Sequence, residues 1–236
     1  MIFTTIIISA QNYPSGKSIL EKIDRNMTAK SRIMTVKMEI GSKNPRIMLM
    51  KTWSVGTQKS FVEFMEPARE KGTKMLKINN QMWIYSPKTK RSIEISGQML
   101  RQSAMGSDMS YGDMMNDGKL LEKYKAEVTG ETTVDGRKCW ILVLTAIVPN
   151  VDYYSQKLSV DQERNVPLKI ELYAKGGKLL KQTTLSDVTK IQGRWFPKSM
   201  LYTDMLRVGN KTKITIQEAD FDVEISESIF SKGNLK

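Results

Sequence analysis

The chain has 236 residues, of which 40% are hydrophobic and 26% charged, and its formal net charge is +12. No stretch approaches the ~20 apolar residues that a membrane-spanning helix needs. Histidine is absent, which excludes serine–histidine and cysteine–histidine nucleophiles and histidine-ligated zinc or iron. The one cysteine, Cys139, lies in an apolar run and is expected to be a buried structural thiol.

The basic residues are scattered along the chain instead of forming a patch. Lysine and arginine alternate with apolar residues in strand-like runs, and no helical segment carries a basic stripe. This pattern favours a solvated outer face of a sheet, with attraction of anionic lipid as the functional alternative. We expect no nucleic-acid partner.

Residues 1–10 are uncharged and mostly apolar, and polar Gln11 and Asn12 follow them. They resemble the apolar core of a secretory signal, with Ala10 as the small residue at the cleavage site. An N-terminal strand is the alternative. We expect export, cleavage near Ala10, and one domain over residues 11–236.

The first periodic segment after this start has helical spacing. Ile19, Leu20, Ile23 and Met27 recur at the intervals of one helix face, with Asp24 on the other side. The pattern predicts an amphipathic helix over residues 18–27.

From Arg32 onward the period changes to two, which indicates strands with one buried face. Short runs follow every ten or so residues, separated by turn dipeptides such as Asn79-Asn80, Asp135-Gly136, Gly176-Gly177 and Gly209-Asn210. The runs cover residues 32–40, 47–55, 61–65, 72–78, 82–85, 91–95, 126–132, 138–147, 156–161, 168–173, 178–188, 200–206 and 212–219. They predict a single, mainly β domain, an antiparallel meander of about ten or eleven strands.

The alternation stops at Gly97 and resumes after Lys119. The segment 98–115 holds five of the chain's sixteen methionines. Ser110 and Asp113 have the spacing of a helix-start box and Gly118 fits a stop, so we expect two short helical pieces around Gly106-Ser107. Methionine is flexible and polarizable, so this segment is predicted to be an adaptable lid; an ordinary core insertion is the alternative.

One helix and one short insertion are thin cover for so large an apolar sheet face, which predicts a cavity between sheet and cover. The candidate cavity residues are the apolar positions in one phase of the strands: Met34, Val36, Met38, Ile40, Leu76, Ile78, Leu168, Ile170, Leu172, Ile214 and Ile216. The candidate lid residues are Met99, Leu100, Met105, Met109, Met114 and Met115.

Three stretches carry a family resemblance. They are Asn80–Pro87 followed by Lys90–Ile95, then Ser103–Asp113, and finally Gly193–Pro197 with the closing 221–230. Over about residues 17–232 the chain resembles the bacterial outer-membrane lipoprotein-sorting proteins, the LolA/LolB-like periplasmic carriers. Met109 stands where that family usually has phenylalanine.

The resemblance implies a strongly curved half-barrel whose open, concave side is covered by helices. It implies a non-enzymatic periplasmic carrier, or transport chaperone, that holds the acyl chains of a lipoprotein or lipid. An inner-membrane transporter, an outer-membrane acceptor and transient membrane contact would follow, with no cofactor and no metal.

Two other functions fit parts of the sequence. A lipid- or protein-sensing regulator of the same fold would act through a membrane partner instead of moving cargo. A carboxylate-pair hydrolase would use Asp108, Asp113 and Asp117, although acids at helix starts and turns are the simpler interpretation.

Overall fold

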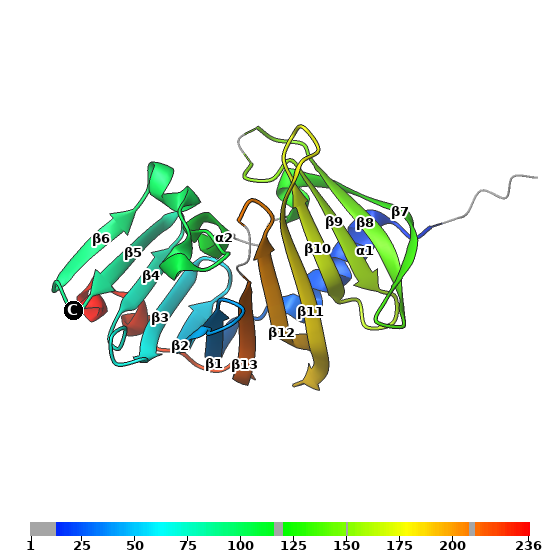
Figure 1. The fold of residues 1–236 in the computed structure, drawn as a ribbon. Coiled ribbons are helices and arrows are strands. Elements are labelled where there is room, and N and C mark those ends of the chain that lie inside the picture. Colours follow the sequence, from blue (N-terminus) through cyan, green and yellow to red (C-terminus); the bar gives the residue numbers. More distant parts are fainter. Residues whose placement is uncertain (1–12, 116–119, 150, 208–210) are drawn as a thin grey trace, which may run out of the picture.

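The computed structural model describes residues 13–115, 120–149, 151–207 and 211–236. Within them the chain forms one antiparallel sheet of 13 strands, in the order β6-β5-β4-β3-β2-β1-β13-β12-β11-β10-β9-β8-β7 (Figure 1). The strands are β1 (Ser31–Ile40), β2 (Arg46–Val55), β3 (Lys59–Glu66), β4 (Lys74–Ile78), β5 (Gln81–Ser86), β6 (Arg91–Ile95), β7 (Tyr124–Val134), β8 (Arg137–Ala146), β9 (Ser155–Asp161), β10 (Pro167–Tyr173), β11 (Leu179–Ile191), β12 (Arg194–Asp204) and β13 (Thr212–Phe221).

The chain begins and ends its strands in the middle of the sheet. β1 pairs with β13, from Arg32 opposite Phe221 to Ile40 opposite Thr212. From this centre β1–β6 run outward as one arm and β13–β7 as the other, so the sheet is open and its edges are β6 and β7. Because these edge strands are neighbours in sequence, their connection must cross the face of the sheet.

That connection contains the lid, which we define as residues 97–115. It comprises η1 (Gly97–Arg101), η2 (Ala104–Gly106) and α2 (Tyr111–Met115), and the short α3 (Leu120–Lys123) precedes β7. The lid lies on the side of the sheet toward which both arms curve (Figure 1).

A second element covers the other part of this concave side. Helix α1 (Gly16–Met27) buries Ile19, Leu20 and Ile23 against the β7–β9 side of the sheet. A Cβ at Gly16 would lie 2.3 Å from the carbonyl oxygen of Ala126, so only glycine allows the helix to start this close to β7.

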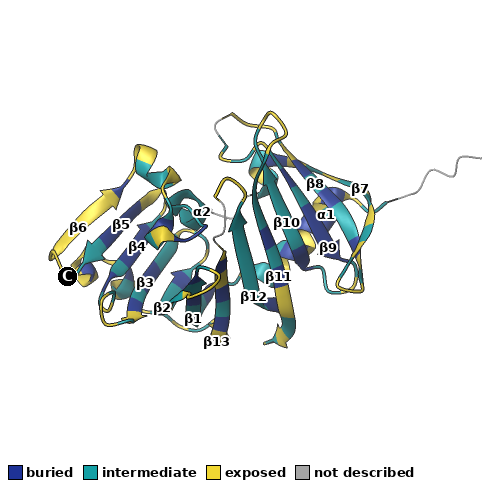
Figure 2. Ribbon diagram, in the orientation of Figure 1, coloured by how far each residue is buried: buried dark blue, intermediate teal, exposed yellow. Residues whose placement is uncertain are grey.

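The opposite, convex face of β3–β5 is covered by the C-terminal tail, η3 (Glu227–Phe230) and η4 (Lys232–Leu235). Phe230 and Leu235 of the tail are buried with Phe61, Leu76 and Trp83. Both faces of these strands are therefore buried, as the dark segments of β3–β5 in Figure 2 show.

The expected mainly β architecture is confirmed, with 13 strands in place of ten or eleven. Each predicted run overlaps a strand, and the Asp135-Gly136 turn has the paired positive φ angles, 47° and 74°, of a two-residue hairpin. The Ser110–Asp113 box forms, because the Ser110 N–H donates to the Asp113 carboxylate and the Asp113 N–H to Ser110 Oγ. Cys139 is buried, as expected.

Some sequence predictions fall outside the described residues: the secretory signal over 1–10 with its cleavage site, Asp117, the Gly118 stop and the Gly209-Asn210 turn. Among the helices that the structure does describe, none has the length and apolar character needed to cross a bilayer.

Candidate functional site

The concave face of β1–β6, together with β12 and β13, buries fifteen apolar residues, of which five are methionine, and eight further methionines pack against them. We call this group the methionine cluster. Thirteen of the chain's sixteen methionines lie in it or pack against it, so its packing can adjust to different shapes. They are Met27, Met34, Met38, Met48, Met50, Met75, Met82, Met99, Met105, Met109, Met114, Met115 and Met200.

Asp108 fixes the middle of the lid to the sheet. Its side chain is 2% exposed, and it accepts hydrogen bonds from Thr212 Oγ1 at 2.6 Å and from the Asp204 N–H at 3.2 Å. The Asp108 N–H donates in turn to Thr212 Oγ1 at 2.9 Å. Arg207 adds bonds of 3.1 Å to Ser103 Oγ and to the Ser107 carbonyl. This part of the lid is thus attached to the β12–β13 end of the sheet.

Asp113 attaches the next part of the lid to the same arm, one strand further out at β11. Its carboxylate forms an ion pair with Lys181 of β11 at 2.5 Å and accepts a hydrogen bond from the Tyr153 hydroxyl at 2.5 Å. The same carboxylate caps α2 through the Ser110 N–H. One side chain therefore sets the start of α2 and its place against β11 and the β8–β9 loop.

Two basic side chains of the first arm hold the lid by its backbone. Arg46 of β2 donates to the carbonyl of Met105, a residue with a positive φ of 53°. Lys77 of β4, 4% exposed, donates to the carbonyl of Met115 at 3.0 Å and to that of Thr57 at 2.8 Å. Lys77 thereby compensates carbonyl groups at the C-terminal end of α2.

A partly open cavity of about 500 Å³, which we call the interior cavity, lies between α1, the lid and the sheet. Apolar side chains of all three elements contribute to its wall: Ile23, Met27, Met109, Met114, Leu158, Ile170 and Leu172. This volume falls within the roughly 300–1,000 Å³ typical of small-molecule sites. Polar and charged residues, among them Asp24, Arg32, Lys59 and Lys77, line the rest of the wall, so the unfilled space under the cover is amphipathic.

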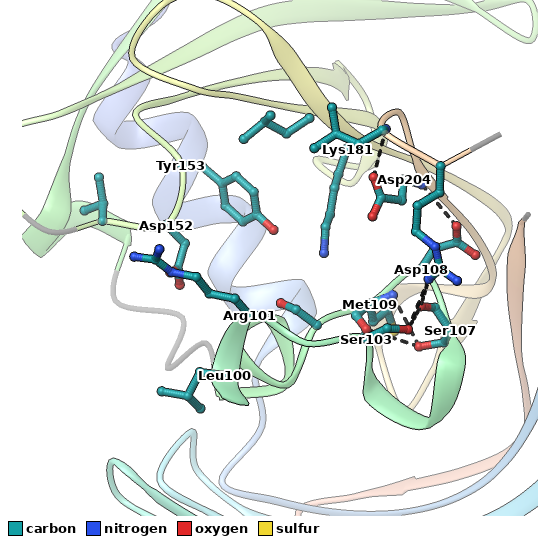
Figure 3. A pocket seen from close by; sticks show the side chains of 15 residues that line it. Leu100, Arg101, Ser103, Ser107, Asp108, Met109, Asp152, Tyr153, Lys181 and Asp204 are labelled. Carbon is teal, nitrogen blue, oxygen red and sulfur yellow. Dashed lines mark hydrogen bonds between the residues drawn. The ribbon is translucent and has the colours of Figure 1, made fainter. Parts of the chain in front are cut away.

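A second, more polar pocket of about 640 Å³ lies outside the interior cavity (Figure 3). Ser103, Ser107 and Met109 line it from the lid, and Tyr153 and Lys181 line it from the facing strands and loop. Met109, Tyr153 and Lys181 line the interior cavity as well. These three side chains therefore form the partition between the outer pocket and the interior.

Burial controls the ionisation of the groups at this partition. Burial first, and then the charge of Asp113, raise the pKa of Tyr202 to about 12. The same two causes raise the pKa of Tyr153 well above its usual range. The Tyr153 phenol, which is protonated at neutral pH even at its ordinary pKa, donates its hydroxyl hydrogen to Asp113.

Most predicted site residues lie on the concave side. Met34, Val36, Met38, Ile40, Ile214 and Ile216 are in the methionine cluster, and all six predicted lid residues pack against it. Of the predicted set, Ile170, Leu172, Met109 and Met114 line the interior cavity directly. Leu100 lines the outer pocket.

Three predicted cavity residues lie elsewhere. Leu76 and Ile78 belong to the cluster under the C-terminal tail, and their neighbour Met75 points to the concave side instead. The prediction that Leu76 and Ile78 face the cavity was wrong. The tail buries the outer face of β4, so this strand lacks the alternation of apolar and polar residues that marks the inward face. Leu168 is buried beside the register shift between Pro167 and Lys169 and is not among the described residues of the cavity wall.

The sequence prediction also missed residues of the site. Met48 and Met50 face inward and lie opposite Met38 and Val36, respectively, in the β1–β2 register. The alternation of residues 47–55 contained the signal that could have located them. Lys181 and Tyr153 gave no such signal, because they meet Asp113 from positions 68 and 40 residues away along the chain.

Comparison with solved structures identifies the fold. A protein of the DUF1329 family from Desulfovibrio piger has 27% identity and a TM-score of 0.85, covering 94% of this chain and 98% of its own. A domain from Vibrio parahaemolyticus, named for outer-membrane lipoprotein sorting, has 24% identity and a TM-score of 0.81, with coverage of 93% and 97%. A LolA superfamily protein from Nitrosomonas europaea has 23% identity and a TM-score of 0.77, with coverage of 94% and 99%.

The family comparison matches residues 56–236 to a model described as an uncharacterized protein. The chain belongs to this family and has the LolA fold. The resemblance predicted from its three motifs is thereby confirmed at the level of fold. No curated protein matches the sequence. In LolA-fold terms, the methionine cluster lines the half-barrel and residues 97–115 cover its open side.

Proposed function

We propose that this LolA-fold protein is a periplasmic carrier that holds the acyl chains of a lipoprotein or lipid and transfers them between membranes without catalysing a reaction. The observation that carries the proposal is the interior cavity of about 500 Å³, which is bounded by apolar residues of α1, the lid and β10. The apolar part of this wall can accept hydrocarbon, beside charged lining residues such as Asp24, Arg32 and Lys59.

The energetics suit reversible carriage. Burying an acyl chain of about 14 methylenes at ~0.8 kcal/mol each gives ~11 kcal/mol before the costs of ordering and immobilisation. The methionines of the lid can repack around chains of different length. Release then requires a change in the lid or a receiver with a better site.

The names of the structural neighbours support the same cargo class and compartment, because two of them are named for lipoprotein sorting or the LolA superfamily. The chain's own Asp108 and Asp113 support carriage over hydrolysis. Asp108 is bonded to Thr212 and Asp113 to Lys181 and Tyr153, so both have a structural role in positioning the lid.

Native mass spectrometry of the protein purified from its own membranes tests the proposal. We expect an acylated peptide or lipid to copurify, and a fluorescent fatty acid to bind the emptied protein. Leu172→Trp would fill the cavity from β10 and should reduce fatty-acid binding at least tenfold. Ile93→Trp, at a position 51% exposed on the edge strand β6, is the matched control. Equal binding by both variants and wild type would refute the cavity as the acyl site.

A further inference from the structure

Exposed apolar side chains gather at the ends of two loops. Of the eight large apolar side chains that are exposed in the described part of the chain, five lie in these loops. We call them the apolar rim: Ile147, Val148 and Tyr154 between β8 and β9, and Met205 and Leu206 between β12 and β13. Ile147 is 61% exposed and Leu206 55%.

Backbone hydrogen bonds place the two loops at one end of the sheet, on either side of the β10–β11 turn. The Tyr154 N–H donates to the carbonyl of Tyr173, where β10 ends, and the Met205 N–H donates to that of Leu180, where β11 begins, both at 2.9 Å. The three connections lie together in Figure 1 and are coloured as largely exposed in Figure 2. The rim is thus one surface, built from segments far apart in sequence.

The rim adjoins the outer pockets beside the partition. Leu206 lines the pocket of about 640 Å³ together with Val151. Val148 lines a neighbouring pocket of about 270 Å³, which shares Tyr153 and Asp113 with the interior cavity. A ligand that leaves the cavity past Tyr153 would therefore emerge among the rim side chains.

The charge around the rim is mainly positive. Lys175 and Lys178 of the β10–β11 turn, Arg207 beside Leu206, and Arg101 of η1 are all exposed. None of the four forms an ion pair with another described residue, and Asp152 and Glu122 are exposed acids in the same region. Exposed apolar groups flanked by exposed bases complement an anionic lipid surface, where each base contributes attraction and the apolar groups insert.

We infer that the apolar rim docks on a membrane surface containing anionic lipid, with the outer pockets facing the bilayer. This inference rests on the proposed carriage of acyl chains and identifies where the cargo enters and leaves. Docking at this end would let the acyl chain of the cargo pass between the bilayer and the cavity without crossing water.

Cosedimentation with lipid vesicles tests the inference, using vesicles of phosphatidylcholine alone and vesicles that also contain phosphatidylglycerol. Wild type is expected to bind the second kind more tightly. The double variant Ile147→Glu/Leu206→Glu should bind it at least tenfold more weakly. The matched control Met65→Glu/Ile93→Glu changes the net charge equally at positions 41% and 51% exposed elsewhere, and should bind these vesicles within about twofold of wild type.

A second variant separates charge from insertion. Lys175→Gln/Lys178→Gln should lower affinity for the anionic vesicles by about fivefold for each charge removed, and leave binding to neutral vesicles unchanged. Circular dichroism confirms folding of every variant. Failure of wild type to bind vesicles, or equal losses in the rim and control variants, would overturn the docking surface.

Fatty-acid retention in solution, measured on the same proteins, keeps the two proposals distinguishable. Rim variants that retain fatty acid but no longer bind vesicles support both docking and carriage. Wild type that binds vesicles through the rim but retains no fatty acid leaves the docking surface standing and refutes the carrier function.

Discussion

The two halves of the concave side are packed with different side chains. Between α1 and β7–β9 the buried residues are mainly branched and aliphatic, among them Leu20, Ile23, Leu142 and Leu144. Under the lid, five of the fifteen buried residues are methionine and eight more methionines pack against them, whereas on the α1 side only Met27 does so. Aliphatic side chains with few rotamers specify one packing, whereas methionine fills irregular space and readjusts. The contrast suggests one half that holds the fold and another that adapts to a ligand, with the interior cavity between them.

The largest expected effect comes from truncating one buried side chain in each half and comparing the losses of stability. Leu20→Ala, on α1, removes a side chain that is 0% exposed and should lower the free energy of unfolding by about 3 kcal/mol. Met48→Ala is equally buried, but neighbouring methionines can move into the space, so we expect a loss nearer 2 kcal/mol. Urea denaturation measures both. An equal loss of unfolding free energy in the two variants would contradict the proposed difference in packing between the two halves.

A polar cluster on the α1 side should give the next largest effect and a clear pH dependence. Burial of Asp161 raises its pKa, but hydrogen bonds from Arg137 and from the backbone and side chain of Arg164 outweigh it and hold the pKa well below its usual range. Asp161→Asn should cost about 2 kcal/mol at pH 7, less than for a fully buried pair because the arginines are partly exposed.

The sign of the pH effect follows from the lowered pKa. The stabilisation by Asp161 is complete above the unfolded-state pKa of about 3.9 and is lost as pH falls toward the folded-state value. Denaturation curves of wild type and Asp161→Asn should therefore converge below about pH 4. Asp135→Asn, in an exposed turn, serves as the control. A difference that stays constant from pH 7 to pH 3 would contradict the assigned role.

On the adaptable side, charge in the lid should impair binding more than folding. Met105→Asp combined with Met109→Asp places carboxylates in the layer that covers the cavity, and should weaken fatty-acid binding about tenfold because each must be desolvated. Both side chains are half-buried, so the sheet should remain folded by circular dichroism. Unchanged retention of the acyl chain would count against the lid role, and Met105→Leu/Met109→Leu is the matched control.

The smallest expected effect concerns the attachment of the lid. Asp113→Asn removes the ion pair with Lys181 while preserving the shape of the side chain. Loss of about 1 kcal/mol of attachment should increase the rate of fatty-acid release about fivefold, with little change in the melting temperature. Stopped-flow release measures this rate. A release rate equal to that of wild type would show that Asp113 only caps α2.

Local patterns in the sequence were sufficient to predict the strands, the amphipathic helix and the lid. Alternation located β1 and the helical spacing located Ile19, Leu20 and Ile23 because each segment buries one face. The prediction of which β4 residues face the cavity failed at Leu76, because β4 is buried on both faces, one by the lid and one by the tail. Periodicity cannot assign such a strand.

The contacts that complete the site depend on tertiary structure. The capping box predicted the bonds between Ser110 and Asp113, but the ion pair of Asp113 with Lys181 joins the lid to a strand that follows it by 68 residues. The apolar rim is similar, because Ile147 and Leu206 gave no local sign that their loops adjoin the same pockets. The cavity itself is a property of the assembled cover, since no single segment encloses it.

The pairing of β1 with β13 means that a cut in the connection between β6 and β7 would sever no pair of neighbouring strands. Each remaining pair lies within one fragment, and the β1–β13 ladder would join the fragments as a two-chain protein. The intact connection therefore adds no strand to the sheet, but it limits how far its two edge strands, β6 and β7, can separate. Lengthening or shortening this connection offers a way to set the width of the half-barrel without altering its strands.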